Sequence, residues 1–273
     1  MCALFGIFDV AEVASSRLKK RLFRNLANAS MVRGKDATGF AYFSNHEIRT
    51  FKTAKPANKM NIFFPNSTKC ICGHTRAFTK GSPLFNDNNH PFLGHTGNTS
   101  FALAHNGIIF NDTYLKISHE LPLSPIQTDS YVAVQLLEEA GNLNFASLAS
   151  TVEALEGSFT FTILDNKNNL YIVKGDSPLE LVYFPDLTLF VYASTPDILN
   201  RALVKSKINN FKYERTELKN GDILKINSEG QIERSTFKIL LFTRSAAVRS
   251  FNLFFHCCVP RGMVVNCRKS QLG

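Results

Sequence analysis

The second residue of the chain is a cysteine, where one residue could supply both a nucleophile and its base. Met1 is normally removed when the residue after it is small, and Cys2 would then carry a free α-amine beside its thiol. An α-amine titrates near about pH 8 and can accept a proton close to neutral pH. Pairing a nucleophile with an N-terminal amine is a recognised activation scheme. Cys2 is therefore a candidate nucleophile, although by itself a cysteine here is more often a buried residue of a first strand.

Polar residues recur in four short segments further along the chain. These are Gly73-His74-Thr75-Arg76 with Thr79 close behind, Asn89-His90-Pro91, His105-Asn106-Gly107 and Thr128-Asp129-Ser130. Each segment has an ordinary explanation when it is taken alone. Arg76 could make a surface ion pair of little value, and Asp129 could cap a helix. The Asn106-Gly107 pair is typical of a hairpin turn.

The order and spacing of these segments resemble the glutaminase domain of class II glutamine amidotransferases, a family of N-terminal nucleophile hydrolases. Residues 1–8, 33–39 and 155–159 are similar to three further motifs of that family, and the resemblance covers residues 2 to about 200. These motifs in order are a much stronger signal than any one of them. Two positions depart from the family pattern: Ala37 stands where a serine is usual, and Tyr131 where a glutamate often follows.

The resemblance implies a hydrolysis that needs neither cofactor nor metal. Cys2 would attack the side-chain carbonyl of L-glutamine, and the resulting oxyanion would be held by the Asn106 side-chain amide and the Gly107 backbone N–H. Preorganised donors of this type stabilise a developing oxyanion, and glycine permits a backbone approach that a Cβ would obstruct.

The resemblance also implies how the two ends of the substrate are held. Arg76 would bind the α-carboxylate through two parallel hydrogen bonds, which lysine cannot copy. Asp129 would bind the α-ammonium. Thr79 and His90 match the family pattern as well and would shape the loop over glutamine.

The elements that must position these residues are long runs of strands with helices at both ends of the runs. Strands are predicted at 3–8, 40–44, 48–53, 69–75, 158–165, 168–174, 179–184, 187–193, 222–226 and 231–238, and helices at 15–29, 129–139, 144–155 and 196–205. Residues 79–98 are predicted to form a long loop, and 101–110 a strand broken at residues 105–107. This pattern favours an α+β fold. The resemblance implies a four-layer α/β/β/α sandwich of two mainly antiparallel sheets.

Composition bounds the domain organisation. The 273 residues are 44% hydrophobic and 19% charged, enough for a sizeable core and unlike a disordered chain. No apolar run reaches the roughly 18 residues of a membrane helix. We expect one glutaminase domain over residues 2–239 and a basic, cysteine-containing tail over 240–273, expected to be poorly ordered. The first residues lack a secretory pattern, which predicts a cytoplasmic protein with reduced thiols.

The net charge and the absence of nucleotide-binding motifs limit which partners we expect for this chain. The net charge is +9, of which five positive charges lie after residue 239, and the remaining 9 − 5 = +4 gives no reason to expect nucleic acid. No nucleotide-binding motif follows residue 238. We therefore expect the ammonia acceptor on a separate synthase protein, unless the chain is truncated or a stand-alone hydrolase.

Two other functions and a metal site remain open at this point. The same fold could cleave another γ-glutamyl or amide substrate, or it could be an inactive binding module with a basic tail. The run Cys70-x-Cys72-x-His74 offers metal ligands, but its spacing is not that of a zinc knuckle. Buried cysteines behave as small hydrophobic residues, which is explanation enough for Cys70 and Cys72.

Overall fold

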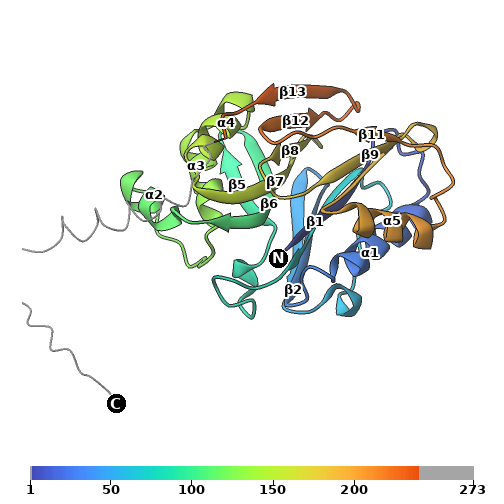
Figure 1. The fold of residues 1–273 in the computed structure, drawn as a ribbon, viewed down its shortest axis with the longest axis horizontal. Helices are drawn as coiled ribbons and strands as arrows, with labels where there is room; N and C mark the ends of the chain where they lie inside the picture. Colours follow the sequence, from blue (N-terminus) through green and yellow to red (C-terminus); the bar gives the residue numbers. More distant parts are fainter. Residues whose placement is uncertain (1, 240–273) are drawn as a thin grey trace, which may run out of the picture. The chain divides into compact units, whose positions relative to one another are not determined.

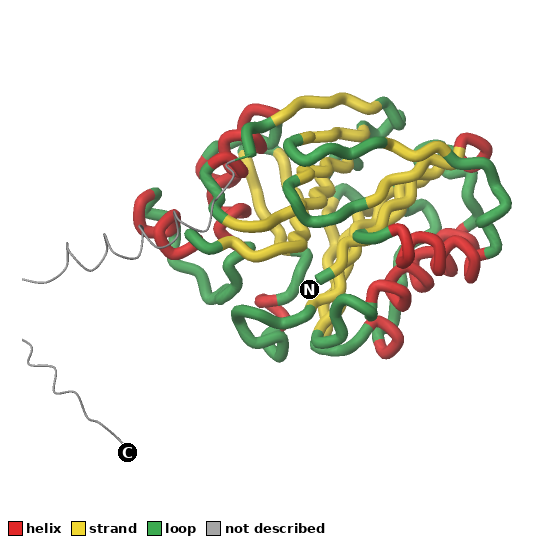
Figure 2. The backbone as a smooth tube through the Cα atoms, in the orientation of Figure 1, coloured by secondary structure: helices red, strands yellow, loops and turns green. Residues whose placement is uncertain are grey.

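Two β-sheets lie face to face, and helices cover the outer face of each (Figures 1 and 2). This computed structural model describes residues 2–239. The tail predicted at 240–273, with its expected lack of order, lies outside the described residues. The predicted four-layer sandwich is confirmed.

The first sheet has seven strands in the order β11-β9-β10-β1-β4-β2-β3, all in antiparallel pairs. Its strands are β1 (Ala3–Asp9), β2 (Ala37–Ser44), β3 (Glu47–Thr53), β4 (Cys70–Arg76), β9 (Glu180–Phe184), β10 (Leu189–Ala193) and β11 (Glu214–Thr216). We call it sheet A.

The second sheet, sheet B, has six strands in the order β13-β12-β8-β7-β6-β5, also antiparallel. Its strands are β5 (Phe92–Thr96), β6 (Thr99–Ile109), β7 (Gly157–Asp165), β8 (Leu170–Lys174), β12 (Asp222–Ile226) and β13 (Ile232–Thr236).

The helices divide between the two outer faces. They are α1 (Ser16–Ser30) and α5 (Pro196–Ser206) on sheet A, α3 (Tyr131–Glu139) and α4 (Phe145–Glu153) on sheet B, and α2 (Asp112–Ser118), which follows β6 (Figure 1). Three single turns of 3-10 helix lie at Ala57–Lys59, Asn86–Asn88 and Pro185–Leu187. Helix α1 begins where Ser15 accepts a hydrogen bond from the Leu18 N–H, as the sequence predicted. None of the described helices is long and apolar enough to cross a membrane.

Alternation along the strands produces three apolar layers. In β1, Phe5 and Ile7 pack toward α1, while Leu4 and Phe8 pack between the sheets. Residues two apart in a strand share one face, so this alternation separates the helix-covered layer from the layer between the sheets. Cys70 and Cys72 are buried free thiols in that inner layer. Within residues 2–239, no three His, Cys, Asp or Glu side chains form a group that could hold a metal ion.

The expectation of an unbroken loop over 79–98 is wrong, because β5 occupies Phe92–Thr96. Its side chains alternate: Phe92 and Thr96 are buried and Leu93 is exposed. Gly94 fits there because a Cβ would lie 2.4 Å from the ring of Phe101 on the next strand. A five-residue strand containing glycine, histidine and threonine has too little apolar content to be recognised by composition.

The expected break in the strand at 105–107 is also wrong. Strand β6 runs from Thr99 to Ile109 without interruption, and Asn106 and Gly107 pair with Thr160 and Phe159 of β7. The hairpin propensity of Asn-Gly is a local preference, and pairing with β7 along this stretch overrides it. Helix α2 and strand β11 were not predicted from the sequence.

Candidate active site

The register of β1 against β4 brings the first predicted site residues together. Ala3 pairs with Thr75, so Cys2 comes next to Arg76 where these two central strands of sheet A end. Cys2 is two residues from Leu4 and Arg76 is four residues from Cys72, so each shares a strand face with that neighbour. Leu4 and Cys72 both lie between the sheets. Both functional side chains therefore point into the gap between the sheets, where it opens at the edge.

A tight turn holds this corner in place. Arg33 Nε donates a hydrogen bond to the Cys2 carbonyl at 2.7 Å, and the Asp36 N–H donates to the Arg76 carbonyl at 3.0 Å. Gly34 lies between them, where a Cβ would be 2.4 Å from the Arg76 carbonyl carbon. The glycine of the 33–39 turn is therefore required for the close approach of this turn to the end of β4.

Sheet B supplies the predicted oxyanion donors from the middle of β6. Asn106 is two residues after Ala104 and so lies on the same face of β6. Because Ala104 packs between the sheets, the Asn106 side chain faces sheet A. Asn106 is 2% exposed, and its Nδ2 has no hydrogen-bond partner within residues 2–239. An unpaired buried amide is costly and rare, so this nitrogen is a donor without a ligand. Gly107 has φ +145°, and a Cβ would lie 1.9 Å from the Ser158 carbonyl oxygen, so only glycine fits.

Asp129 lies just before α3 and does not cap it. Helix α3 begins at Tyr131, and Asp129 Oδ2 instead accepts a hydrogen bond from the Ile109 N–H at 2.7 Å. This contact ties the segment before α3 to the end of β6, close to Gly107. The capping explanation for Asp129 is therefore wrong. The neighbouring Thr128 has a buried hydroxyl with no partner among the described residues.

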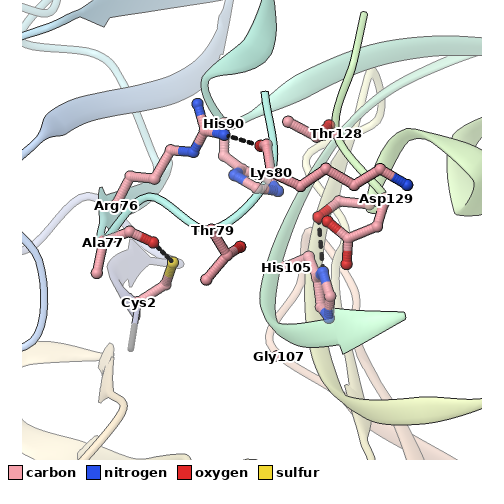
Figure 3. A pocket seen from close by; sticks show the side chains of 11 residues that line it. Cys2, Arg76, Ala77, Thr79, Lys80, His90, His105, Gly107, Thr128 and Asp129 are labelled. Atoms are coloured by element: carbon pink, nitrogen blue, oxygen red, sulfur yellow. Dashed lines mark hydrogen bonds between the residues drawn. The ribbon is translucent and has the colours of Figure 1, made fainter. Parts of the chain in front are cut away.

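These residues surround a small pocket of about 260 Å³ that is open to solvent (Figure 3). The residues that line it are Cys2, Arg76, Ala77, Thr79, Lys80, His90, His105, Gly107, Thr128, Asp129 and Ser130. In Figure 3, Cys2 and Arg76 lie on one side, and Thr128 and Asp129 lie on the other. Most of the lining residues are polar or charged, which favours a polar ligand.

Six of the seven predicted site residues line this pocket, and the seventh, Asn106, precedes the lining residue Gly107. Five further residues line it but were not predicted as site residues: Ala77, Lys80, His105, Thr128 and Ser130. Each is the immediate neighbour of a predicted residue, which is the only sequence signal for them. Ala37 and Tyr131, the two departures from the family pattern, are absent from the lining.

The Arg76 guanidinium is already engaged by the loop that follows it. Its Nη1 donates to Asn89 Oδ1 at 2.7 Å, and its Nη2 donates to the carbonyls of Gly81, at 2.7 Å, and Lys80. Burial lowers the pKa of Arg76, and the nearby Cys2 and Asp129 act against that shift. Arginine remains protonated in proteins, so the pocket holds a cation on this side.

The Cys2 thiol is protonated at rest. It donates a hydrogen bond from Sγ to the Ala77 carbonyl at 3.6 Å. Burial raises the pKa of Cys2, the Ala77 contact and the Arg76 cation lower it, and Asp129 raises it. A nucleophilic Cys2 therefore needs a base.

Three histidines lie beneath the pocket and are neutral. The His90 ring packs 4.2 Å from His74 and 6.3 Å from His105, centroid to centroid. Burial, reinforced by Arg76 and His105, lowers the pKa of His74 to about 3, and burial also lowers the pKa of His90 and His105. His74 Nε2 lies 3.0 Å from the His105 carbonyl, which fixes this nitrogen as the protonated one in a neutral ring. The His74 and His105 rings are hydrogen-bonded, whereas neither ring nitrogen of His90 has a partner within residues 2–239.

Comparison with known proteins agrees with this site. Residues 75–201 match the glutamine amidotransferase domain family. The fold matches that of the glutamine phosphoribosylpyrophosphate amidotransferase from B. subtilis, with a TM-score of 0.66 and 22% identity over 88% of this chain and 50% of that one. The family match covers a little under half of the chain. The matched residues include Arg76, Asn106, Gly107 and Asp129, and Cys2 lies before them.

The curated relatives of this chain are longer than the chain itself. It is 24% identical over 251 residues to 7-cyano-7-deazaguanine synthase 2 of Sulfurisphaera tokodaii, covering 88% of this chain and 53% of the relative. It is 27% identical over 210 residues to the 7-cyano-7-deazaguanine synthase of Sulfolobus acidocaldarius, covering 72% and 44%. The chain thus spans about half the length of these relatives.

Proposed function

We propose that this domain hydrolyses L-glutamine to glutamate and ammonia, with the Cys2 thiol as nucleophile. The observation that carries the proposal is the unpaired, buried Nδ2 of Asn106 beside Gly107, which faces the gap between the sheets into which Cys2 points from the opposite sheet. A donor that has no protein partner is available for an oxyanion. The same pocket contains a thiol that can form the covalent intermediate.

Two opposite charges support glutamine as the substrate. A free amino acid presents a carboxylate and an ammonium on one carbon, and Arg76 and Asp129 offer the complementary charges on opposite sides of one small pocket. Both side chains are largely buried, at 3% and 6% exposure, so their attraction for substrate charges is screened less than at a surface. The carboxylate would share the guanidinium with the loop carbonyls or replace them.

The reaction balances with residues of this chain. The Cys2 thiol gives its proton to its own α-amine, directly or through a water, and the thiolate attacks the glutamine side-chain carbonyl. Asn106 Nδ2 and the Gly107 N–H hold the oxyanion. The C–N bond then breaks, the protonated amine returns its proton to the leaving ammonia, and a γ-glutamyl thioester remains. Water hydrolyses this thioester, releasing glutamate and restoring the thiol.

The three neutral histidines support the choice of the α-amine as base. A ring whose pKa lies far below neutrality, as that of His74 does, holds a proton poorly and is a weak base at pH 7. His105 is, moreover, occupied by Ser130, whose Oγ lies 2.7 Å from Nδ1.

We propose further that the ammonia passes to an acceptor site in another domain or in a partner protein. The relatives are about twice as long as the matched region, and both are named as 7-cyano-7-deazaguanine synthases. The structural neighbour is named for phosphoribosylpyrophosphate. A glutaminase half joined to different acceptor halves accounts for both the length and the names, and we expect the acceptor enzyme to be a cytoplasmic synthase.

The test is a glutaminase assay on the full chain, together with its intact mass. The active protein should begin at Cys2. Cys2→Ala should abolish glutamate release, and Cys2→Ser should leave little, because a hydroxyl is a far weaker nucleophile. Cys72→Ala, which removes a buried thiol between the sheets, is the matched control and should stay active. Activity in Cys2→Ala, or an active enzyme that retains Met1, would overturn the proposal.

A further inference from the structure

Lys80 joins the pocket to helix α2. Its Nζ lies 2.8 and 2.7 Å from the two carboxylate oxygens of Asp112, the first residue of α2. The Asp112 side chain is 5% exposed and that of Lys80 is 49% exposed. In Figure 3 the Lys80 side chain extends from the Arg76 side of the pocket toward the side on which Asp129 lies. The ion pair thus links the pocket residue Lys80 to the start of α2, where its acid is buried.

The main chain of the same lysine contacts the substrate-binding arginine. Arg76 Nη2 donates to the Lys80 carbonyl and to the Gly81 carbonyl. Lys80 is therefore held twice, by Asp112 through its side chain and by Arg76 through its carbonyl. A shift of Lys80 would move two of the hydrogen-bond acceptors that orient the guanidinium.

The later part of the loop is held by other contacts. Asn88 Oδ1 accepts from the Gln127 N–H at 2.8 Å, and Asn89 Nδ2 donates to the Pro83 carbonyl at 2.8 Å. These side chains are 1% exposed, so this part is fixed without Lys80. By contrast, the side chain of Lys80 is held by its ion pair with Asp112.

We infer that Asp112 is a positioning residue for glutamine binding: its ion pair with Lys80 holds the segment 77–81 so that Arg76 faces the substrate carboxylate. This inference rests on the proposed glutaminase function. Asp112 contacts neither Cys2 nor Asn106, so the chemical step is left untouched and the effect falls on binding. A loss of binding raises KM and leaves kcat unchanged.

A double-mutant cycle tests the pair, and the chain offers a matched control. Asp112 has a second lysine partner, Lys116, on its own helix at 3.3 Å, which does not line the pocket. Lys80→Met and Asp112→Asn should each raise KM for glutamine roughly 3- to 10-fold, between the values for an exposed pair and for a buried charged hydrogen bond. The double variant should be no worse than the worse single variant. Lys116→Met should keep the wild-type KM.

Salt supplies a readout that a purely structural role would not move. Because Lys80 is half-exposed, added salt should weaken its ion pair and raise the wild-type KM. That part of the salt dependence should be absent in Lys80→Met. Additive effects in the cycle, an equal effect of Lys116→Met, or a loss of kcat at constant KM would each overturn the inference.

Hydrogen exchange keeps the inference separate from the proposed function. Amides of residues 77–81 in the full chain should exchange faster in Lys80→Met than in wild type, and no faster in Lys116→Met. If the wild-type chain does not hydrolyse glutamine, the proposed function fails, while unchanged exchange in Lys80→Met overturns the positioning role by itself.

Discussion

The two sheets contribute to the pocket in different states of hydrogen bonding. On the sheet A side, the donors of Arg76 are engaged by Asn89 and by the carbonyls of the following loop. On the sheet B side, Asn106 Nδ2 and Thr128 Oγ1 have no partner within residues 2–239. The sheet B side is therefore ready to receive a ligand, whereas the sheet A side must exchange or share its partners when a carboxylate arrives.

This difference suggests that the sheet B side serves the chemical step, whereas the sheet A side serves substrate binding. Donors that are unpaired at rest need no reorganisation, which is the condition under which an oxyanion hole is most effective. A cation that is satisfied by a loop couples substrate binding to that loop. We therefore expect changes on the sheet B side to affect kcat most and changes on the sheet A side to affect KM as well.

The largest of the expected effects on this comparison is that of Asn106→Ala. Removing the unpaired amide should lower kcat by roughly 10²- to 10³-fold, as for other oxyanion donors, with little change in KM. Steady-state kinetics with glutamine check this. Thr162→Val is the matched control, because the Thr162 hydroxyl is also buried and unpaired but does not line the pocket, and it should leave kcat unchanged. A pure KM effect in Asn106→Ala would contradict the oxyanion role.

The next effect is that of Arg76→Lys on the sheet A side. The charge remains, but the paired hydrogen bonds to a carboxylate and the ties to the loop carbonyls are lost. We expect kcat/KM to fall roughly 10- to 100-fold, the range for losing a hydrogen bond to a charged group. Wild-type kcat/KM in this variant would show that Arg76 does not bind the carboxylate.

A fall in pH should lower the stability of the folded chain, because the three buried histidines between the two sides of the pocket are held neutral. The pKa of His74 is about 3 in the folded chain and about 6.5 when unfolded, so only the unfolded state binds this proton between those values. The stability that the neutral His74 contributes is therefore fully present above about pH 6.5 and is lost progressively as pH falls toward about 3. Thermal unfolding between pH 7.5 and 5 measures this. His74→Gln should flatten the dependence, whereas substitution of the exposed His46 should not; the same acid dependence in His74→Gln would contradict it.

The smallest expected effect is that of removing residues 240–273. All the residues that line the pocket, and the elements that carry them, lie before residue 240. We expect kcat/KM for glutamine to stay within about twofold of the value for the full chain, because every residue that lines the pocket is retained. A collapse of activity or folding in the shortened chain would show that the predicted boundary at residue 239 is wrong.

Elements with strong periodicity were predictable, and those with weak or conflicting local signals were not. Helix α1 and strand β1 have continuous apolar patterns and agree with prediction to within a residue or two. Strand β5 has little apolar content, and at Asn106-Gly107 a local turn preference opposes the pairing with β7. Pairing partners come from elsewhere in the chain, so local reasoning could not weigh them.

The sequence by itself determined which side chains are available and in what order, and this was enough to indicate a thiol hydrolase with an arginine and an aspartate for a zwitterionic substrate. Tertiary structure decided what they do together. The β1–β4 register places Cys2 beside Arg76, strand parity turns both of them and Asn106 into one gap, and the Ile109 contact draws Asp129 away from helix capping. These outcomes depend on pairing and packing between segments far apart in the chain, whereas propensity and spacing act only over a few residues.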